Sequence, residues 1–211
     1  MIALLMKGYF ITFEGGEGSG KTTQLAHLAR HLEKKGYPVC KTREPGGTLI
    51  GEAIRSVLLV PKEVNCTPKA ELFLYLAGRA QHLDEVILPA LSDHQIVLCD
   101  RFTDSTLVYQ GVARDLPLRK VQDMTRFAAE GLKPDITFLL DIDVKKGLAR
   151  LKTRREMNRL DLEANSFHQK VREGYLALAE EAPERIHVIN AGISERRVLI
   201  AIRKIVDDIL P

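Results

Sequence analysis

The stretch "FEGGEGSGKTTQ", residues 13–24, decides the fold of this chain. It has the spacing G-x-x-x-x-G-K-T, with Gly15, Gly20, Lys21 and Thr22 at the fixed positions. A β-rich run precedes it and a pattern of apolar residues at helical spacing follows it, which is the context of a phosphate-binding loop. A glycine-rich turn that binds nothing is the alternative, and this strand–loop–helix context argues against it.

In such a loop the backbone N–H groups turn inward around phosphate oxygens, and the start of the helix adds its positive dipole end. We expect Lys21 to reach the β- and γ-phosphates and the hydroxyl of Thr22 to bind Mg²⁺. The predicted nucleotide-binding residues are Gly15, Gly16, Glu17, Gly18, Ser19, Gly20, Lys21, Thr22 and Thr23.

The rest of the chain alternates extended and helical patterns. Short apolar runs predict strands within residues 8–15, 38–47, 95–100, 135–142 and 185–191. Patterns of helical period predict helices over 21–36, 48–59, 69–91, from about 144, and over 194–210. Five buried strands alternating with helices indicate an α/β fold with a parallel sheet flanked by helices. Without a linker or repeat in the sequence, we expect a single domain over residues 1–211.

Composition limits the function classes. Hydrophobic residues make up 45% of the 211, enough for a core, and the net charge of +3 does not predict binding to a nucleic acid polymer. Cys40, Cys66 and Cys99 lack the spacing of a metal site and indicate free thiols in a reducing compartment. No run approaches the ~20 apolar residues of a membrane span, and the start does not fit a signal peptide. We therefore expect a soluble cytoplasmic protein, beginning at Met1 or Met6.

The chemically active residues follow the predicted strands, where parallel sheets bind ligands. A GTP-dependent switch would carry N-K-x-D and D-x-x-G, and both are absent from the sequence. A motor or transporter usually places a second acid after the strand-end acid to act on water. Here Asp100 is followed by Arg101, which suits an anionic acceptor better.

Three segments together resemble the thymidylate kinase family: the loop, "TREPGGT" (residues 42–48) and "DRFTDSTLVYQG" (residues 100–111). The resemblance extends from Phe10 to the last helix. It implies phosphorylation of dTMP by ATP with Mg²⁺ in dTTP biosynthesis. It also implies a P-loop nucleoside-monophosphate-kinase-like sheet of five parallel strands, a mobile lid and a homodimer packed through helices.

A kinase for a nucleoside monophosphate must hold two anions in line, and arginine pairs with phosphate in bidentate fashion. The alternative for each arginine is a surface salt bridge. By resemblance, Arg79 hydrogen-bonds a thymine carbonyl, and Tyr75, where the family usually has Phe, stacks on the base or is a core aromatic. Ser105 and Thr106 approach the base edge or cap the following helix, and Tyr109 contacts the sugar. The predicted acceptor-binding residues are Glu14, Arg43, Pro45, Arg55, Tyr75, Arg79, Arg101, Ser105, Thr106, Tyr109 and Gln110.

Carboxylates and a basic segment complete the predicted site. We expect Thr22 on the metal, with Asp100 and Glu14 acting through water, and Glu17 facing solvent. The segment at about 152–163 is the predicted lid, and the alternative is a solvated basic helix face. Adenine is expected against residues 190–194. The predicted catalytic residues are Lys21, Arg101, Arg154, Arg159 and Glu14.

Two other functions stay open at this point. One is a kinase for another nucleoside monophosphate or a deoxynucleoside, because Tyr75 and Asn158 depart from the family pattern. The other is a regulator that binds a nucleotide without catalysis.

Overall fold

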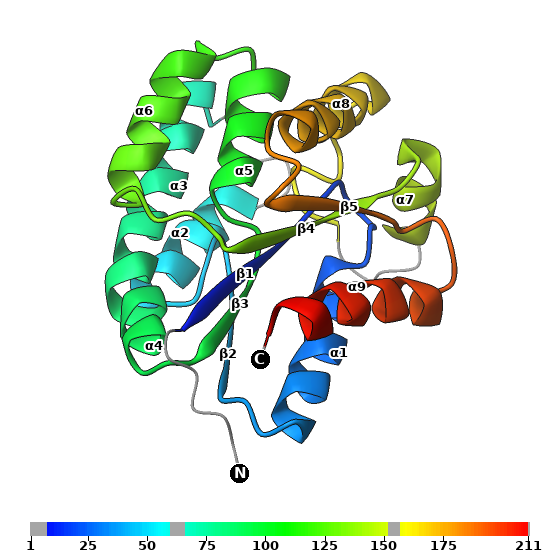
Figure 1. Cartoon of the computed structure of the whole chain (residues 1–211). Helices are drawn as coiled ribbons and strands as arrows, with labels where there is room; N and C mark the ends of the chain where they lie inside the picture. Colours follow the sequence, from blue (N-terminus) through cyan, green and yellow to red (C-terminus); the bar gives the residue numbers. More distant parts are fainter. Residues whose placement is uncertain (1–7, 60–65, 152–156, 211) are drawn as a thin grey trace.

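The sheet has five parallel strands in the order β2-β3-β1-β4-β5 (Figure 1). A computed structural model describes residues 8–59, 66–151 and 157–210 of the chain. The strands are β1 (Tyr9–Glu14), β2 (Val39–Arg43), β3 (Ile96–Asp100), β4 (Ile136–Asp141) and β5 (Ile186–Asn190). All five strands lie where the sequence predicts them, and the predicted fold class is confirmed.

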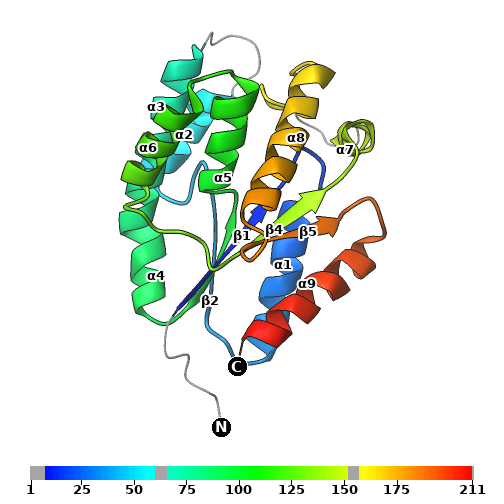
Figure 2. The same ribbon diagram turned by 45° about the horizontal axis from the view of Figure 1, so that its top comes forward.

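Helices cover both faces of this sheet (Figures 1 and 2). On one face α1 (Lys21–Lys34) packs against α9 (Glu195–Ile209). The other face carries α8 (Asn165–Glu181), α5 (Thr103–Thr106) with the π-helical turn η2 (Leu107–Ala113), and α4 (Leu88–Ser92). Three more helices lie further out: α2 (Leu49–Leu59), α3 (Pro68–His82) and α6 (Leu118–Ala128). The helix α3 packs against both α2 and α6. The helix α7 (Val144–Leu151) follows β4.

Two helical features differ from the sequence patterns. The helix predicted over 69–91 is interrupted by the π-helical turn η1 (Leu83–Ile87) between α3 and α4. The helices α6 and α8 were not predicted, yet α8 contributes side chains to the site. The start of α3 follows ordinary chemistry, since Pro68 occupies the first turn and the Thr67 hydroxyl accepts a bond from the Ala70 N–H.

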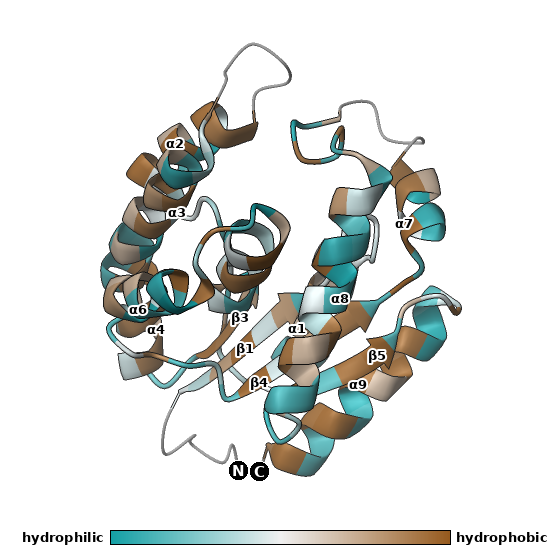
Figure 3. Ribbon diagram, turned by 90° about the horizontal axis from the view of Figure 1, so that it is seen from above, coloured by the Kyte–Doolittle hydropathy of each residue, from teal (hydrophilic) through white to brown (hydrophobic). Residues whose placement is uncertain are grey.

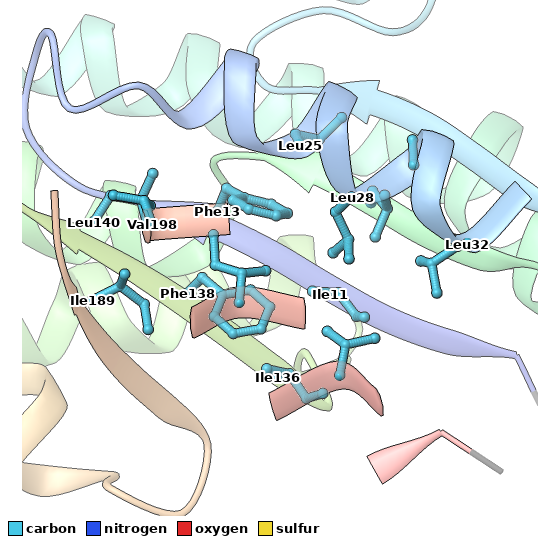
Figure 4. Close-up of a cluster of buried hydrophobic side chains, with 14 of the residues drawn as sticks. Ile11, Phe13, Leu25, Leu28, Leu32, Ile136, Phe138, Leu140, Ile189 and Val198 are labelled. Atoms are coloured by element: carbon cyan, nitrogen blue, oxygen red, sulfur yellow. The ribbon is translucent and has the colours of Figure 1, made fainter. Parts of the chain in front are cut away.

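Successive side chains of the central strands point to opposite faces of the sheet and join two different core clusters. In β1, Ile11 and Phe13 face α1 and α9 together with Leu28 and Val198 (Figure 4). Phe10 faces the opposite layer with η1. Burial of each such side chain contributes about 1.5–3 kcal/mol, so both faces of β1 fix its register. The carboxyl ends of the strands are thereby held side by side, with Phe13 and Arg43 both paired in register to Asp100.

Two simpler expectations can be compared directly with the described residues. There, Cys40, Cys66 and Cys99 are free thiols, as predicted. In the same part of the chain, every helix is too short or too polar to cross a membrane.

Candidate active site

A cavity of about 550 Å³ opens at the carboxyl ends of β1, β2 and β3. Its walls come from the phosphate loop, the turn after β2, helices α2 and α3, and the segment after β3. Most of the predicted site residues line it: Glu17, Gly18, Gly20, Lys21, Thr22, Arg43, Pro45, Arg55, Tyr75, Arg79, Asp100, Arg101, Ser105, Thr106, Tyr109 and Gln110. Glu14, Gly15, Gly16, Ser19, Thr23 and Arg159 are not among its lining residues.

The phosphate loop connects β1 to α1 and folds around the Lys21 ammonium. Lys21 is buried and donates to the carbonyl oxygens of Gly15 and Gly16 at 3.0 and 2.9 Å and to the Ser19 hydroxyl at 3.3 Å. Burial, and next the Arg101 charge, lower the pKa of Lys21 to about 8. An anion in the cavity would favour the charged ammonium, so the loop holds a cation ready for phosphate oxygens.

Gly18 makes the loop compact. Its φ is +69°, and a Cβ at this position would lie 2.1 Å from the carbonyl oxygen of Gly147 in α7. Only glycine permits both the left-handed backbone and this approach. The start of α7 is thereby packed directly against the loop.

Thr22 and Asp100 form a second polar corner of the cavity. The Thr22 hydroxyl donates to Asp100 Oδ2 at 2.6 Å, joining the start of α1 to the end of β3. A hydroxyl and a carboxylate are hard oxygen ligands of the kind that Mg²⁺ prefers. Their metal-binding role stays a prediction, and the donor set fits the ion.

Arg101 stands at the centre of the site, and its partners correct one expectation. Its backbone lies in the left-handed region, with a φ of +73°. Its guanidinium donates to Gly15 O at 3.1 Å and to Glu17 Oε1 at 2.6 Å, and the Tyr109 hydroxyl also donates to Glu17 at 2.8 Å. Glu17 therefore does not face solvent as predicted, because a cation and a phenol draw it inward.

The charge state of Glu17 follows from these neighbours. Burial opposes ionisation, but Arg101 and Lys21 outweigh it and lower the pKa of Glu17 to about 2. The carboxylate is thus ionised at neutral pH, beside the two cations of the predicted phosphate site. It lines the cavity, so an incoming anion would compete with it for Arg101.

Glu14 is buried and is not among the residues that line the cavity. It is 1% exposed and accepts bonds from the Phe102 N–H at 2.7 Å, the Ser105 hydroxyl at 2.6 Å and the Tyr175 hydroxyl at 2.8 Å. Burial, and next the nearby Asp104 charge, raise the pKa of Glu14 to about 7. Its catalytic and metal-binding roles stay predictions, and its contacts fix the segment after β3.

The segment after β3 also corrects the capping alternative for Ser105 and Thr106. Helix α5 begins at Thr103, and a side-chain cap bond is not found at its start. Ser105 therefore lies inside the helix, where Glu14 and Tyr175 hold it, and Thr106 is buried at the cavity edge. Gln110 donates to Glu71 Oε1 at 2.7 Å, which fixes its amide next to α3.

The wall opposite the loop carries a buried arginine. Arg79 is 2% exposed, and its Nε and Nη2 donate to Glu44 Oε2 at 2.9 and 2.7 Å. Its Nη2 also donates to Phe102 O at 3.0 Å, while Nη1 is buried and is without a hydrogen-bond partner among the described residues. Tyr75 lies one turn earlier on α3, half-buried and lining the cavity, so it is not a core aromatic.

The two arginines after β2 have partners within their own segment. Arg43 pairs with Glu52 on the surface at 2.9 Å, which matches the surface-salt-bridge alternative in this arrangement. Arg55 donates to Pro45 O at 2.9 Å and is half-buried. Both line the cavity, so their predicted contacts with an acceptor phosphate stay open.

The predicted lid is described only from residue 157 onward, and Arg154 lies outside the described residues. Arg159 packs against the α2–α3 wall, with Nε donating to Leu58 O at 3.1 Å and Nη2 donating to the buried carboxylate of Glu71. Asn158 and Leu160 line the cavity beside it. The loop expected to contact adenine, residues 190–194, is not among the cavity's lining residues.

Comparison with known proteins decides the family. The family model for thymidylate kinase matches residues 13–202. Thymidylate kinase of Pelotomaculum thermopropionicum is 48% identical over 206 residues, which cover 97% of this chain and 95% of that relative. This chain belongs to the thymidylate kinase family.

Other members of the thymidylate kinase family support the same conclusion. Thymidylate kinase of Geobacillus sp. is 50% identical over 189 residues, covering 89% of this chain and 90% of the relative. The crystal structure of thymidylate kinase from Ehrlichia chaffeensis matches with a TM-score of 0.77 and 34% identity, over 94% of this chain and 98% of that chain. The fold inferred from the sequence is therefore that of a solved thymidylate kinase.

Several residues that shape this thymidylate kinase site were not predicted. Glu44 is a buried carboxylate that holds Arg79, and Glu71 is a buried carboxylate that holds Gln110 and Arg159. His82 is a buried imidazole that contacts Glu44. Tyr175 on α8 reaches Glu14 and Ser105. Glu71 and His82 stand at positions of α3 where the helical period predicts buried apolar residues, and this could have indicated them. The i, i+4 pair Val171–Tyr175 could have indicated α8.

Proposed function

We propose that this chain transfers the γ-phosphoryl group of ATP to dTMP and releases ADP and dTDP. The observation that carries the proposal is that one cavity joins the Lys21 loop to the Arg79–Tyr75 wall, with Arg101 between them. A nucleotide triphosphate on the loop and a monophosphate with its base on the wall would bring their phosphates together at Arg101. Placing two anions in line in this way is most of what such catalysis requires.

Each part of the cavity has a role in this proposal. Lys21 and the loop N–H groups bind the donor phosphates, and Arg101, Arg55 and Arg43 neutralise the acceptor phosphate. Transfer forms a bond between an acceptor phosphate oxygen and the γ-phosphorus, and breaks the bond from that phosphorus to the β–γ bridging oxygen. The acceptor oxygen is already anionic, so a general base is not required.

Mg²⁺ is the proposed cofactor, held by Thr22 with Asp100 nearby. When bound, it neutralises charge on the donor phosphates. Glu17 rather than Glu14 lines the cavity, so Glu17 is the better placed carboxylate to contact the acceptor. Arg159 and Arg154 are proposed to act on the transferring group from the segment at 152–163, as the family resemblance implies.

The substrate wall selects the base. Arg79 Nη1 is a buried donor without a partner among the described residues, so a base carbonyl opposite it would satisfy it. A site that leaves a buried donor unpaired for the wrong ligand discriminates strongly. Tyr75 offers a flat aromatic face on the same side of the cavity.

We also propose a cytoplasmic homodimer that does not bind nucleic acid polymers. In Figure 3, the ribbons of α2 and α3 carry many apolar residues. Large apolar side chains are exposed on the adjacent helices α2, α3 and α6, including Leu49 and Phe127 at 92% and 87%. Phe73 on α3 is 56% exposed. Exposed apolar side chains gathered on neighbouring helices suit protein–protein contact, and a second copy of the chain is the occupant that the family resemblance implies.

The test is a substrate panel. Purified protein with ATP and Mg²⁺ is offered dTMP, dUMP, UMP, dCMP, AMP and thymidine, and ADP release is followed with and without excess EDTA. We expect the highest kcat/KM for dTMP and loss of transfer with EDTA. A higher kcat/KM for any other acceptor would refute dTMP as the substrate, and full activity in EDTA would refute the metal requirement.

A further inference from the structure

A line of polar groups connects β2 to the far end of α3, with Thr42 and Glu44 lining the cavity and His82 fully buried. The Thr42 hydroxyl lies 2.5 Å from His82 Nε2, and His82 Nδ1 lies 3.1 Å from Glu44 Oε1. The other oxygen of Glu44 accepts both bonds from Arg79. His82 is 0% exposed and Glu44 is 6% exposed, so these groups exchange hydrogen bonds with one another and with the cavity rather than with bulk water.

The direction of these bonds follows from the charge of Glu44. Burial opposes its ionisation, but Arg79 and His82 lower the pKa of Glu44, so it is a carboxylate that only accepts. His82 must then donate from Nδ1, and its Nε2 must accept from the Thr42 hydroxyl if the ring is neutral. This arrangement sets the ring plane and tautomer of His82, as a second partner usually does for histidine.

The far end of this chain of bonds is Arg79, which lines the cavity. Glu44 holds Nε and Nη2 of Arg79, Phe102 O takes a second bond from Nη2, and the Phe102 ring lies 5.1 Å from the guanidinium carbon. Three of the five N–H groups of the guanidinium are therefore engaged. Nη1 is the remaining group, and it is buried without a partner among the described residues.

The turn after β2 depends on the same histidine. Gly47 has a φ of +81°, and a Cβ there would lie 2.7 Å from His82 Nε2 and 2.8 Å from Thr42 Oγ1. The backbone of this turn therefore rests directly on the His82–Thr42 contact. Movement of the imidazole would disturb both the turn that lines the cavity and the carboxylate that aims Arg79.

We propose that Thr42, His82 and Glu44 are positioning residues that set base specificity by aiming Nη1 of Arg79 at a pyrimidine carbonyl. This inference rests on the proposed function. None of the three needs to touch the reacting phosphates. They act through Arg79, whose planar fork is useful only when its plane is fixed.

The experiment measures preference rather than activity. The acceptors are dTMP, 5-methyl-dCMP and 2-thio-dTMP. In 5-methyl-dCMP the carbonyl acceptor at position 4 is replaced by an amino donor and N3 becomes an acceptor, whereas 2-thio-dTMP weakens the acceptor at position 2. The readout is the ratio of kcat/KM for dTMP to that for each analogue. A loss of folded protein lowers both values and leaves the ratio unchanged, so the ratio separates positioning from general damage.

Two His82 variants form a matched pair. Asn and Leu are similar in size and leave similar space, but only Asn can donate to Glu44 from the position of Nδ1. We expect His82→Leu to lower one of the two preference ratios by about ten-fold, the worth of one charge-assisted hydrogen bond, and His82→Asn to retain most of it. Equal ratios in both variants, or a wild-type ratio in His82→Leu, would overturn the proposal.

A milder variant covers the case in which His82→Leu does not fold. Thr42→Val keeps the shape of the side chain and removes the bond to His82 Nε2. It should lower the same ratio by about three-fold, the worth of one neutral hydrogen bond, and an unchanged ratio would overturn the role of Thr42 and His82. If the wild-type protein does not phosphorylate dTMP at all, the proposed function fails instead, so the two failures are distinguishable.

Discussion

The contact between Arg159 and Glu71 allows the most detailed prediction. Glu71 is a 0% exposed carboxylate on α3, and Arg159, which belongs to the predicted lid segment, reaches it with a side chain that is 15% exposed. When Arg159 is truncated, Glu71 keeps Gln110 at 2.7 Å and two longer contacts from Arg114 at 3.4 Å. The loss should therefore match one hydrogen bond to a charged group, about 1.5–3 kcal/mol, and not the ~3–5 kcal/mol of an isolated buried charge.

A double-mutant cycle measures this energy. We expect Arg159→Ala to lower the free energy of unfolding in urea by about 2 kcal/mol. The coupling between Arg159→Ala and Glu71→Gln should be about 1–2 kcal/mol. The matched control is Arg126→Ala on exposed α6, whose partner Asp123 lies 4.0 Å away, and it should change stability by less than about 0.5 kcal/mol. Additive effects of the Arg159 and Glu71 changes would refute the conclusion that this contact holds the segment to α3.

The same Arg159→Ala protein tests catalysis. If Arg159 acts on the transferring group, kcat should fall about hundred-fold while the KM for dTMP changes much less. If only KM rises, Arg159 holds a bound anion and does not act in the transition state.

Three further predictions concern Lys21, Glu14 and Phe127. Lys21→Ala should lower ADP release in the presence of dTMP by at least about hundred-fold while the melting temperature stays within a few degrees, and full activity would refute the loop assignment. The pKa of Glu14 is about 7 in the folded chain and near 4.5 unfolded, so the folded state holds the extra proton between these values and the free energy of unfolding falls as pH rises through that window. Glu14→Gln should remove this fall relative to the wild type, measured by urea unfolding at pH 4.5 and pH 8, and a variant with the wild-type pH dependence would contradict the assignment. Phe127→Glu on the exposed α2–α3–α6 face should shift sedimentation from dimer to monomer, whereas the surface control Arg126→Ala should leave it unchanged; a dimeric Phe127→Glu protein would place the interface elsewhere.

Much of the fold could be predicted because its signals are local. A buried parallel strand reads as a short apolar run, and Ile11, Phe13, Val97 and Leu98 all pack into the core as such runs predict. The loop spacing also fixes local geometry, since the positive φ angles at Gly15, Gly18 and Gly20 are conformations that glycine adopts readily. The helices α6 and α8 were missed, although each has buried residues at helical spacing, such as Val121 and Thr125 in α6 and Val171 and Tyr175 in α8.

The sequence by itself determined the sheet, the loop and which residue types gather at the carboxyl ends of the strands. Only the tertiary structure decided how those side chains pair. Glu17 is drawn to Arg101, 84 positions away, and Arg159 to Glu71, 88 positions away, so spacing along the chain carries no signal for either pair. The physical reason is that a buried charge must find its partner among whatever the packed helices bring within about 3 Å. His82 and Glu44 show the same effect, because β2 and α3 meet only in the folded chain and there fix the direction of Arg79.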